Sequence, residues 1–294
     1  MDVIVSQLFT GASTGAVLLL VALGLALTFG QMGVINMAHG EFLMAGAYTA
    51  YLTQQVVSNS DVSLLIALPL GFLVAGLLGL LLEMTIISRM YHRPLDTLLV
   101  TFGVGLILQQ IARDVFGAQP KAVASPSWLH GQIDVLGYGY PVTRLFIVAI
   151  AVGCLAGTAA VLKYTALGRR IRATVQNRDL AETVGVSTRG TDRVTFFLGS
   201  GLAGVAGVAL TLVTATVSNL GTSYIVPAFL VVVAGGIGQI KGSVIAAFAL
   251  GIVGAFLTYY TSGSLATVLT FVLVVAFLQI RPQGLFTVRT RSLA

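Results

Sequence analysis

The sequence has few charged residues and a single cysteine. Only 9% of its 294 residues are charged, and 56% are hydrophobic, whereas about 25% of a soluble domain is charged. A soluble fold of this length could not bury so much apolar surface, because surface area falls too slowly with size. Cys154 stands alone inside an apolar run, which excludes an intrachain disulfide framework and a multi-cysteine metal site. The composition therefore predicts an integral membrane protein.

Sequence motifs of ATP binding and of catalysis are also missing. There is no G-x-x-x-x-G-K-[ST] phosphate loop and no H-E-x-x-H motif. The run 235–242 is rich in glycine, but Lys241 stands in the wrong place for a phosphate loop. His39, His92 and His130 are too scattered to hold a metal. We expect no catalytic residue, no metal and no cofactor, so any ATP that drives transport must be hydrolysed by another chain.

What the sequence does contain is a series of apolar segments. Most reach about 20 residues, the length that a helix needs to cross the hydrocarbon core. The seventh and eighth are short and meet at a glycine-rich junction, so they form either two spans or a broken, re-entrant pair. We expect an all-α, polytopic membrane helix bundle with about 8–9 transmembrane helices in one domain, residues 1–294. The segments cover residues 9–30, 37–57, 62–87, 95–116, 143–165, 194–217, 225–240, 243–260 and 264–280.

Basic residues indicate the orientation in the membrane. They gather at the ends of apolar runs, which argues against a nucleic-acid partner. Cytoplasmic loops carry an excess of Lys and Arg, so the three clusters predict a cytoplasmic C-terminus and an extracytoplasmic N-terminus. Segment 117–142 then lies outside, where its Pro, Trp and Tyr residues predict an ordered cap. The clusters are Arg89 and Arg93; Lys163, Arg169, Arg170, Arg172, Arg178, Arg189 and Arg193; and Arg281, Arg289 and Arg291.

Several polar residues stand inside the apolar segments. Such residues are costly in a bilayer and usually face the bundle interior or a cavity. One interpretation is the lining of a solute pathway; the other is a structural role, as a helix cap or a hydrogen bond between helices. Glu83 stands near Arg89 and Arg93, which favours a structural ion pair formed through a bend or a partner helix. The candidate pathway residues are Asn36, His39, Glu41, Thr101, Gln109, Gln110 and Tyr224.

The basic segment 166–193 is longer than a connection needs to be. Its centre, RRIRATVQNRDLAETVGV, predicts a short helix on the cytoplasmic face, and Gly185 suits a left-handed C-cap at its end. A surface helix followed by a break suits a membrane subunit that docks into a groove of a motor domain. An ordinary interfacial helix is the alternative. The candidate coupling residues are Gln176, Asn177, Arg178, Asp179, Ala181, Glu182 and Gly185.

Motifs along nearly the whole chain resemble the branched-chain amino acid type of ABC importer permeases. They are GVINMAHGEFLMAG at 33–46, the Arg93-Pro94-Leu95 start, the loop 168–185 and the glycine-rich run 235–242. In detail the chain is most similar to the urea-transporting branch. The urea-type stretches are RPLDTLLVTFGVGLILQQ at 93–110, TVQNR at 174–178, SGLAGVAGVALTL at 200–212, SYIVPAFLVVVAGGIGQIKG at 223–242 and RPQGLF at 281–286.

This resemblance implies the permease subunit of an ATP-driven importer in a bacterial inner membrane, for urea. The alternatives are the same machine importing branched-chain amino acids, and a stand-alone channel or secondary carrier. The implied partners are a second, similar permease subunit, two cytoplasmic ATPase subunits, an extracytoplasmic substrate-binding protein and membrane lipid. The family's coupling loop falls on 179–185, with Asp179 where the related motif often has Glu.

Overall fold

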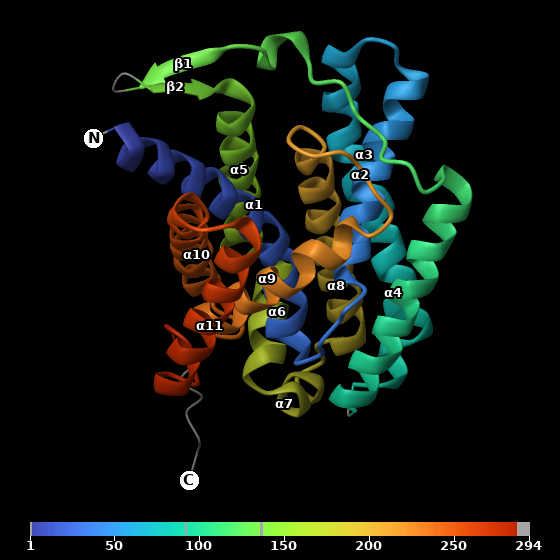
Figure 1. The fold of residues 1–294 in the computed structure, drawn as a ribbon. Helices are drawn as coiled ribbons and strands as arrows, with labels where there is room; N and C mark the ends of the chain where they lie inside the picture. The colour runs from blue at the N-terminus through green and yellow to red at the C-terminus, as the bar shows by residue number, and fades with distance from the viewer. Residues whose placement is uncertain (1, 92, 136–137, 287–294) are drawn as a thin grey trace.

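The computed structural model describes residues 2–91, 93–135 and 138–286, which are almost entirely helical (Figure 1). The helices are α1 (Asp2–Met32), α2 (His39–Val56), α3 (Ser60–Thr85), α4 (Pro94–Phe116), α5 (Val142–Tyr164), α6 (Ala166–Gln176), α7 (Arg178–Thr183), α8 (Thr188–Leu210), α9 (Leu220–Gly235), α10 (Ile240–Tyr260) and α11 (Gly263–Ile280). Two short 3-10 turns, η1 (Ile87–Arg89) and η2 (Ser127–Leu129), and a hairpin of β1 (Gln132–Val135) and β2 (Tyr138–Pro141) accompany them.

Seven described helices are long and apolar enough to cross a membrane, namely α1, α3, α4, α5, α8, α10 and α11. The prediction of an all-α polytopic bundle is confirmed. The other two predicted segments form α2 and α9, which fall short for different reasons. α2 carries too many polar residues, whereas α9, with 16 residues, extends only about 24 Å at 1.5 Å per residue. Neighbouring helices bury part of each, so neither helix faces lipid along its whole length.

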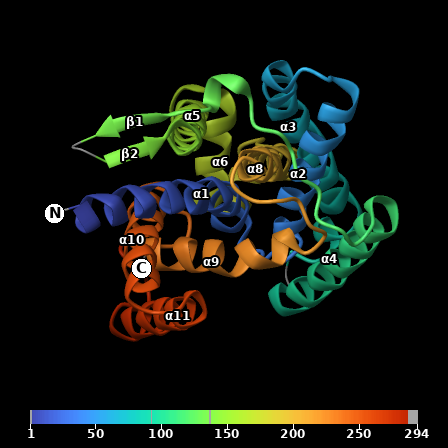
Figure 2. The ribbon, with the colours of Figure 1, turned by 45° about the horizontal axis from the view of Figure 1, so that its top comes forward.

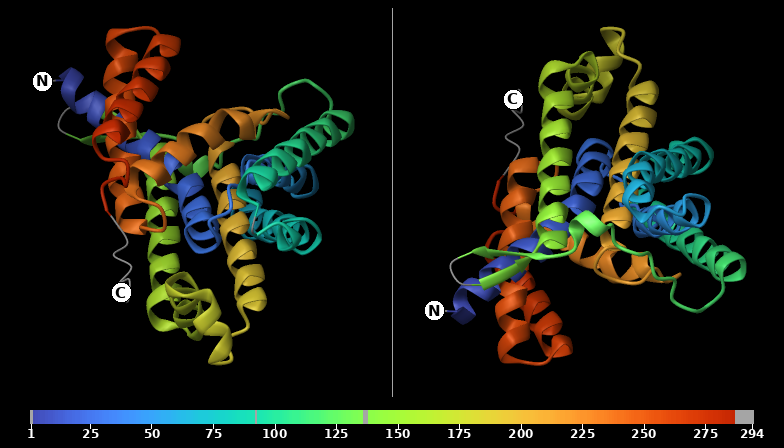
Figure 3. Two further views of the ribbon diagram at one scale, coloured as in Figure 1. Left: turned by 90° about the horizontal axis from the view of Figure 1, so that it is seen from below. Right: turned by 90° about the horizontal axis from the view of Figure 1, so that it is seen from above.

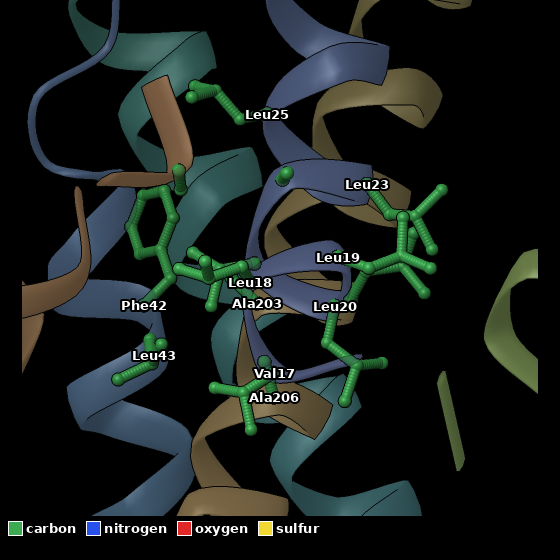
Figure 4. Packing of buried hydrophobic residues seen from close by; sticks show 14 of the residues in the cluster. Val17, Leu18, Leu19, Leu20, Leu23, Leu25, Phe42, Leu43, Ala203 and Ala206 are labelled. Carbon is green, nitrogen blue, oxygen red and sulfur yellow. The ribbon is translucent and has the colours of Figure 1, made fainter. Parts of the chain in front are cut away.

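The helices form an inner group and an outer group. α1 and α8 are central, because most of the apolar stretch of each is buried inside the bundle. α1 is apolar on all sides from Ala16 to Leu27, the pattern of a helix surrounded by protein. Its leucines pack against Phe42 of α2 and Ala203 of α8 (Figure 4). α4, α5 and α11 are peripheral and expose large apolar side chains, as expected of helices that face lipid.

Glycine brings the inner helices into backbone contact. A Cβ atom built on Gly46 of α2 would lie 2.1 Å from the carbonyl oxygen of Gly204 of α8, and one on Gly204 would lie 2.2 Å from the carbonyl oxygen of Gly71 of α3. α8 therefore sits between α2 and α3 at a separation that any larger side chain would prevent.

α9 and α10 are two helices joined by residues 236–239, and α9 lies across the end of α10 rather than beside it (Figure 2). At their junction Gly235 and Gly242 meet, since a Cβ on Gly235 would come within 2.4 Å of the Gly242 carbonyl carbon. The chain after α11 returns to this junction. The amide of Leu285 donates to the carbonyl of Ala234 and that of Phe286 to the carbonyl of Gly235, so this segment binds carbonyls that the end of α9 leaves free.

The segment between α4 and α5 crosses one end of the bundle and is fastened at several points. Ser127 donates from its amide and its hydroxyl to Asp61 at the start of α3. Lys121 pairs with Thr216 through two backbone hydrogen bonds, and the hairpin pairs Gln132 with Pro141. Figure 1 shows this segment at the end opposite to α6 and α7. The ordered cap that the sequence predicts for 117–142 is therefore present, and its extracytoplasmic side stays a prediction.

The contact between α8 and α3 makes a prediction for stability. Replacing Gly204 by alanine places a methyl group against the Gly71 carbonyl, and overpacking of this kind costs about 1–3 kcal/mol. We expect an apparent Tm about 5 °C lower for the detergent-solubilised protein, measured in a thermal unfolding assay. Gly103→Ala on α4 is the matched control, because nothing lies within 4 Å of the added methyl. Equal melting of both variants would contradict the backbone contact.

Candidate pathway and coupling sites

The turn before α2 is buried and fixes α2 to α1. The side-chain oxygen of Asn36 accepts a hydrogen bond from the amide of Ala38 at 3.0 Å. His39 is fully buried, and its Nε2 donates to the carbonyl oxygen of Val21 of α1 at 3.2 Å. Asn36 Nδ2 and His39 Nδ1 have no hydrogen-bond partner among the described residues. These contacts favour the structural role for Asn36 and His39, as a turn-forming side chain and as a hydrogen bond between helices.

Glu41 belongs to a polar group that joins three helices through Gln109. One of its carboxyl oxygens accepts from Nε2 of Gln109 of α4 at 2.8 Å, and the same nitrogen lies 2.8 Å from the hydroxyl of Thr222 of α9. The Glu41 side chain is buried, with its second oxygen unpartnered in the described structure. Thr222 is exposed and Gln109 is half-buried, so the group reaches the surface of the protein at α9. We call Glu41, Gln109 and Thr222 the three-helix polar group.

α4 reaches this group through one face. Thr101 donates to its own helix and accepts a hydrogen bond from the amide of Met37 at 3.1 Å. Gly105, one turn later, faces Glu41, since a Cβ there would lie 3.6 Å from the Glu41 Cγ. Gln109 follows after another turn. The spacing of four residues therefore presents a hydroxyl, a gap and an amide to α2 in succession.

The remaining pathway candidates lie elsewhere. Gln110 is exposed and donates to Asp114 of its own helix at 2.8 Å. Tyr224 is two residues from Thr222 and therefore on another face of α9, where it lines a cavity of about 480 Å³ between α1, α9, α10 and α11. Hydroxyl groups dominate the polar lining of this cavity, with Thr10, Ser223 and Thr270 among them. α9 thus lies between two polar regions, the three-helix polar group and the cavity at Tyr224. The sequence alone does not distinguish them.

The predicted coupling helix is two helices instead of one. Asn177 is extended, with φ −160° and ψ 108°, and ends α6. Its side chain accepts from the amide of Leu180 at 2.9 Å and so caps α7. Gly185 has φ +84°, as predicted for a left-handed C-cap, and the amide of Val186 binds the carbonyl of Ala181. An N-cap residue inside the predicted helix is the physical reason for the break.

α7 is attached to α8 and leaves one side free. The Ala181 side chain is buried, whereas Gln176, Asn177 and Asp179 are exposed. The hydroxyl of Thr188, at the start of α8, donates to the exposed Glu182. α7 therefore has a face that no described residue covers, as a docking helix requires.

Arg178 connects α7 to the inner helices. Its guanidinium lies 2.5 Å from a carboxyl oxygen of the buried Asp192 of α8 and stacks over the ring of Tyr91, 5.1 Å from the centroid. The Tyr91 hydroxyl donates to Glu83 of α3 at 2.5 Å, and Arg193 lies 3.5 Å from the other Glu83 oxygen. Burial, together with this hydrogen bond, raises the pKa of Tyr91, so Tyr91 remains a donor. We call these five residues the α7–α3 polar chain.

The ion pair predicted for Glu83 has different partners. Arg93 pairs instead with Asp96, at 3.9 Å, and Arg89 takes part in none of the ion pairs of the described residues. Glu83 faces α8, so its cation comes from Arg193, 110 residues along the chain. The described residues contain no group of His, Cys, Asp and Glu suited to a metal. His92, Arg289 and Arg291 lie outside them.

The residues that sequence analysis did not single out for a functional role are Tyr91, Asp192 and Arg193. Asp192 and Arg193 stand at the polar start of an apolar segment. Charged residues in that position are usually exposed to solvent at the end of a helix. Tyr91 stands in the turn between α3 and α4, where polar residues are common. The sequence does show carboxylates and cations in separate segments. These charges suggest a pairing only when the helices that carry them are known to be neighbours.

The bundle and its polar groups define a membrane permease. Residues 7–278 match the family described as branched-chain amino acid transport system / permease component, and the chain belongs to this family. It is a transport subunit and not an enzyme. It is 29% identical to the high-affinity branched-chain amino acid transport system permease protein LivH of Escherichia coli K12, over 95% of this chain and 94% of LivH. It is 26% identical to BraD of Pseudomonas aeruginosa, over the same shares. A probable LivH of Methanocaldococcus jannaschii is also 26% identical, over 94% of this chain and 90% of that protein. No solved structure matches.

Proposed function

We propose that the chain is the membrane-spanning subunit of an ATP-driven ABC importer of branched-chain amino acids. The observation that supports this most is the family match, which covers 7–278 and therefore includes the polar group and α7. The relatives named above are permeases of branched-chain amino acid transport systems. Urea, which the short motifs of the sequence favoured, is named by none of them.

The three-helix polar group supports an amino acid over urea. Urea is uncharged and needs only amide, hydroxyl and carbonyl partners along its path. An amino acid is a zwitterion, and its ammonium group is best bound by a carboxyl group. Glu41 supplies a carboxyl oxygen that no described residue occupies. Gln109 and Thr222, on the open side of the group, are the donor and the hydroxyl that a substrate meets first.

Transport then follows from differences in contact between two states. Gln109 holds α4 to both α2 and α9. A substrate ammonium that replaces the Gln109 amide at Glu41 frees α4 from α2 at this level. Only interactions that differ between the two states shift their populations, and this exchange of partners is such a difference.

The partners that this function requires are ATPase subunits, a second permease subunit and a substrate-binding protein. α7 is the segment that we assign to the ATPase, because Asp179 and its neighbours are exposed. The α7–α3 polar chain carries a displacement of α7 to α3 and α8, since Arg178 holds Asp192 and stacks on Tyr91. The basic clusters support a cytoplasmic position for α7 and the C-terminus, and we assign the chain to the inner membrane of a bacterial cell.

Uptake by cells that express the complete operon tests the substrate. We expect saturable, ATP-dependent uptake of radiolabelled leucine and no uptake of radiolabelled urea above that of cells carrying the empty vector. Urea uptake without leucine uptake would reverse the assignment. Flux through liposomes that contain this chain alone, without any ATPase, would reject the importer and favour a channel or carrier.

Glu41→Gln tests the role of the carboxyl group. The variant keeps the shape of the side chain and removes its charge, and a hydrogen bond to a charged group contributes about 1.5–3 kcal/mol. We expect leucine uptake at subsaturating concentration to fall about tenfold or more, with normal amounts of protein in the membrane. Asp114→Asn, an exposed carboxylate of α4, is the control and should transport normally. Wild-type uptake by Glu41→Gln would remove the carboxyl group from the pathway.

Charge reversal at Asp179 and a bulky residue at Gly185 test the coupling role of α7. Asp179→Lys changes the exposed face of α7. Gly185→Val forces a β-branched residue to φ +84°, which disturbs the end of the helix. We expect both variants to insert and to lose uptake while the assembled complex still hydrolyses ATP. Asp134→Lys in the hairpin is the control. Wild-type coupling in both α7 variants would refute the assignment.

A further inference from the structure

α5 and α8 are separated by a gap. α5 packs chiefly against α1 and little against α8, although the two run alongside each other and are joined through α6 and α7 (Figure 3). The space between them is a cavity of about 260 Å³, lined among others by Leu27, Phe72, Cys154, Gly157, Leu162 and Leu202. We call this cavity the α5–α8 slot. Its lining is apolar apart from Thr158, Thr195 and the thiol.

The glycines of α5 show that the slot is open space. The inner helices use glycine for contact, as at Gly46 and Gly204, where a Cβ would meet backbone atoms. On α5, a Cβ built on Gly153 or Gly157 meets nothing within 4 Å. The small side chains of this face therefore widen the gap instead of closing it.

The slot continues at both ends. Toward the N-terminal end of α5, the slot shares Phe72, Cys154 and Val205 with a second apolar groove of about 540 Å³, which reaches Ile150. Toward α6 it shares Leu27, Leu162 and Ile171 with a third groove of about 520 Å³. Along α5, the rise over the 12 residue steps from Ile150 to Leu162 is about 18 Å. This length is comparable to one leaflet of the hydrocarbon core, about 15 Å.

The third groove adds polar and cationic side chains to an apolar lining. Arg172, Gln176, Gln239 and Lys241 line it. Arg172 follows Ile171 of the slot lining, and its guanidinium donates to the carbonyl of Leu162, which places it at the mouth. Neither Arg172 nor Lys241 takes part in the ion pairs of the described residues. An apolar channel of leaflet length thus ends between two cations and two amides.

We propose that this channel is a binding site for one anionic phospholipid. An acyl chain occupies the α5–α8 slot, and the phosphate lies between Arg172 and Lys241, with the two glutamines beside the headgroup. The charge of the groove selects the anionic lipid, since a neutral or zwitterionic headgroup gains less from two adjacent cations. The bound lipid fills the space that separates α5 from α8 and ties α6 to residues 238–241.

Binding to the purified, detergent-solubilised chain tests the site. The probes are phosphatidylglycerol and, for comparison, phosphatidylcholine, detected by native mass spectrometry. We expect retention of one phosphatidylglycerol per chain and weaker retention of phosphatidylcholine. Arg172→Gln and Lys241→Gln should each weaken phosphatidylglycerol binding about fivefold, because a cation near an anionic lipid contributes about 1 kcal/mol. Arg89→Gln, an exposed cation of the α3–α4 turn, is the control and should bind normally.

A slot-filling variant separates the acyl site from simple charge attraction. Gly157→Leu places a side chain where an acyl chain would lie, and each buried methylene contributes about fourfold to affinity. Loss of two or three methylene contacts predicts at least tenfold weaker binding. Gly103→Leu on α4, also in open space, should have no effect. Normal binding by Gly157→Leu would overturn the slot, and equal retention of the two lipids would overturn the anionic site.

The single cysteine gives a second measurement on the unmodified protein. Cys154 lines the slot and is half-buried, so its labelling by an apolar maleimide reports the slot alone. We expect phosphatidylglycerol to slow the labelling of Cys154 in the wild-type chain severalfold. This protection should disappear in the variant that carries both Arg172→Gln and Lys241→Gln. Labelling at the same rate with and without the lipid would reject the proposal even if Gly157→Leu does not fold.

Discussion

The structure depends on how closely its inner helices approach one another. Gly24 of α1 meets the carbonyl of Gly199 of α8, Gly40 of α2 meets Gly221 of α9, and Gly207 of α8 meets the carbonyl of Leu43 of α2. Lipid and apolar side chains attract a helix almost equally, so the stability of the bundle comes from packing and from hydrogen bonds between helices. Backbone contact at glycine maximises that packing. It also fixes the distances at which the polar side chains of α2, α8 and α9 meet their partners.

The polar groups fall where this close packing ends. The three-helix polar group joins α4, a peripheral helix, to α2 and α9. The α7–α3 polar chain joins the surface helix α7 to α3 and α8. A polar contact away from water is directional and can exchange one partner for another, whereas interlocked backbones cannot shift without large strain. The protein thus combines an inner group of helices with fixed spacing and outer helices held by exchangeable contacts.

Much of this was predictable from the sequence, because a membrane-crossing helix has a one-dimensional signature. The helices α3, α4 and α5 begin and end within about two residues of the predicted segments. α8 was predicted at 194–217 and spans Thr188–Leu210, because its first turns are polar and capped by Ser187. α1 and α9 also begin before their predicted starts, by seven and five residues. The pairing of side chains was not predictable. Glu41 and Gln109 are 68 residues apart, and nothing local to either indicates the other.

The two halves of segment 166–193 show the same limit. Its helical character and the turn at Gly185 were evident, but Asn177 serves both to stop α6 and to start α7. Asn is tolerated within a helix, so only the packing of α6 and α7 decides between continuation and a break.

The return of residues 284–286 to the end of α9 has a consequence for biosynthesis. Among the described residues, the carbonyls of Ala234 and Gly235 accept hydrogen bonds from Leu285 and Phe286, about fifty residues later in the chain. While the ribosome is still adding α10 and α11, the C-terminal end of α9 stays without these donors. The α9–α10 junction therefore receives these two hydrogen bonds only after α11 has been synthesised.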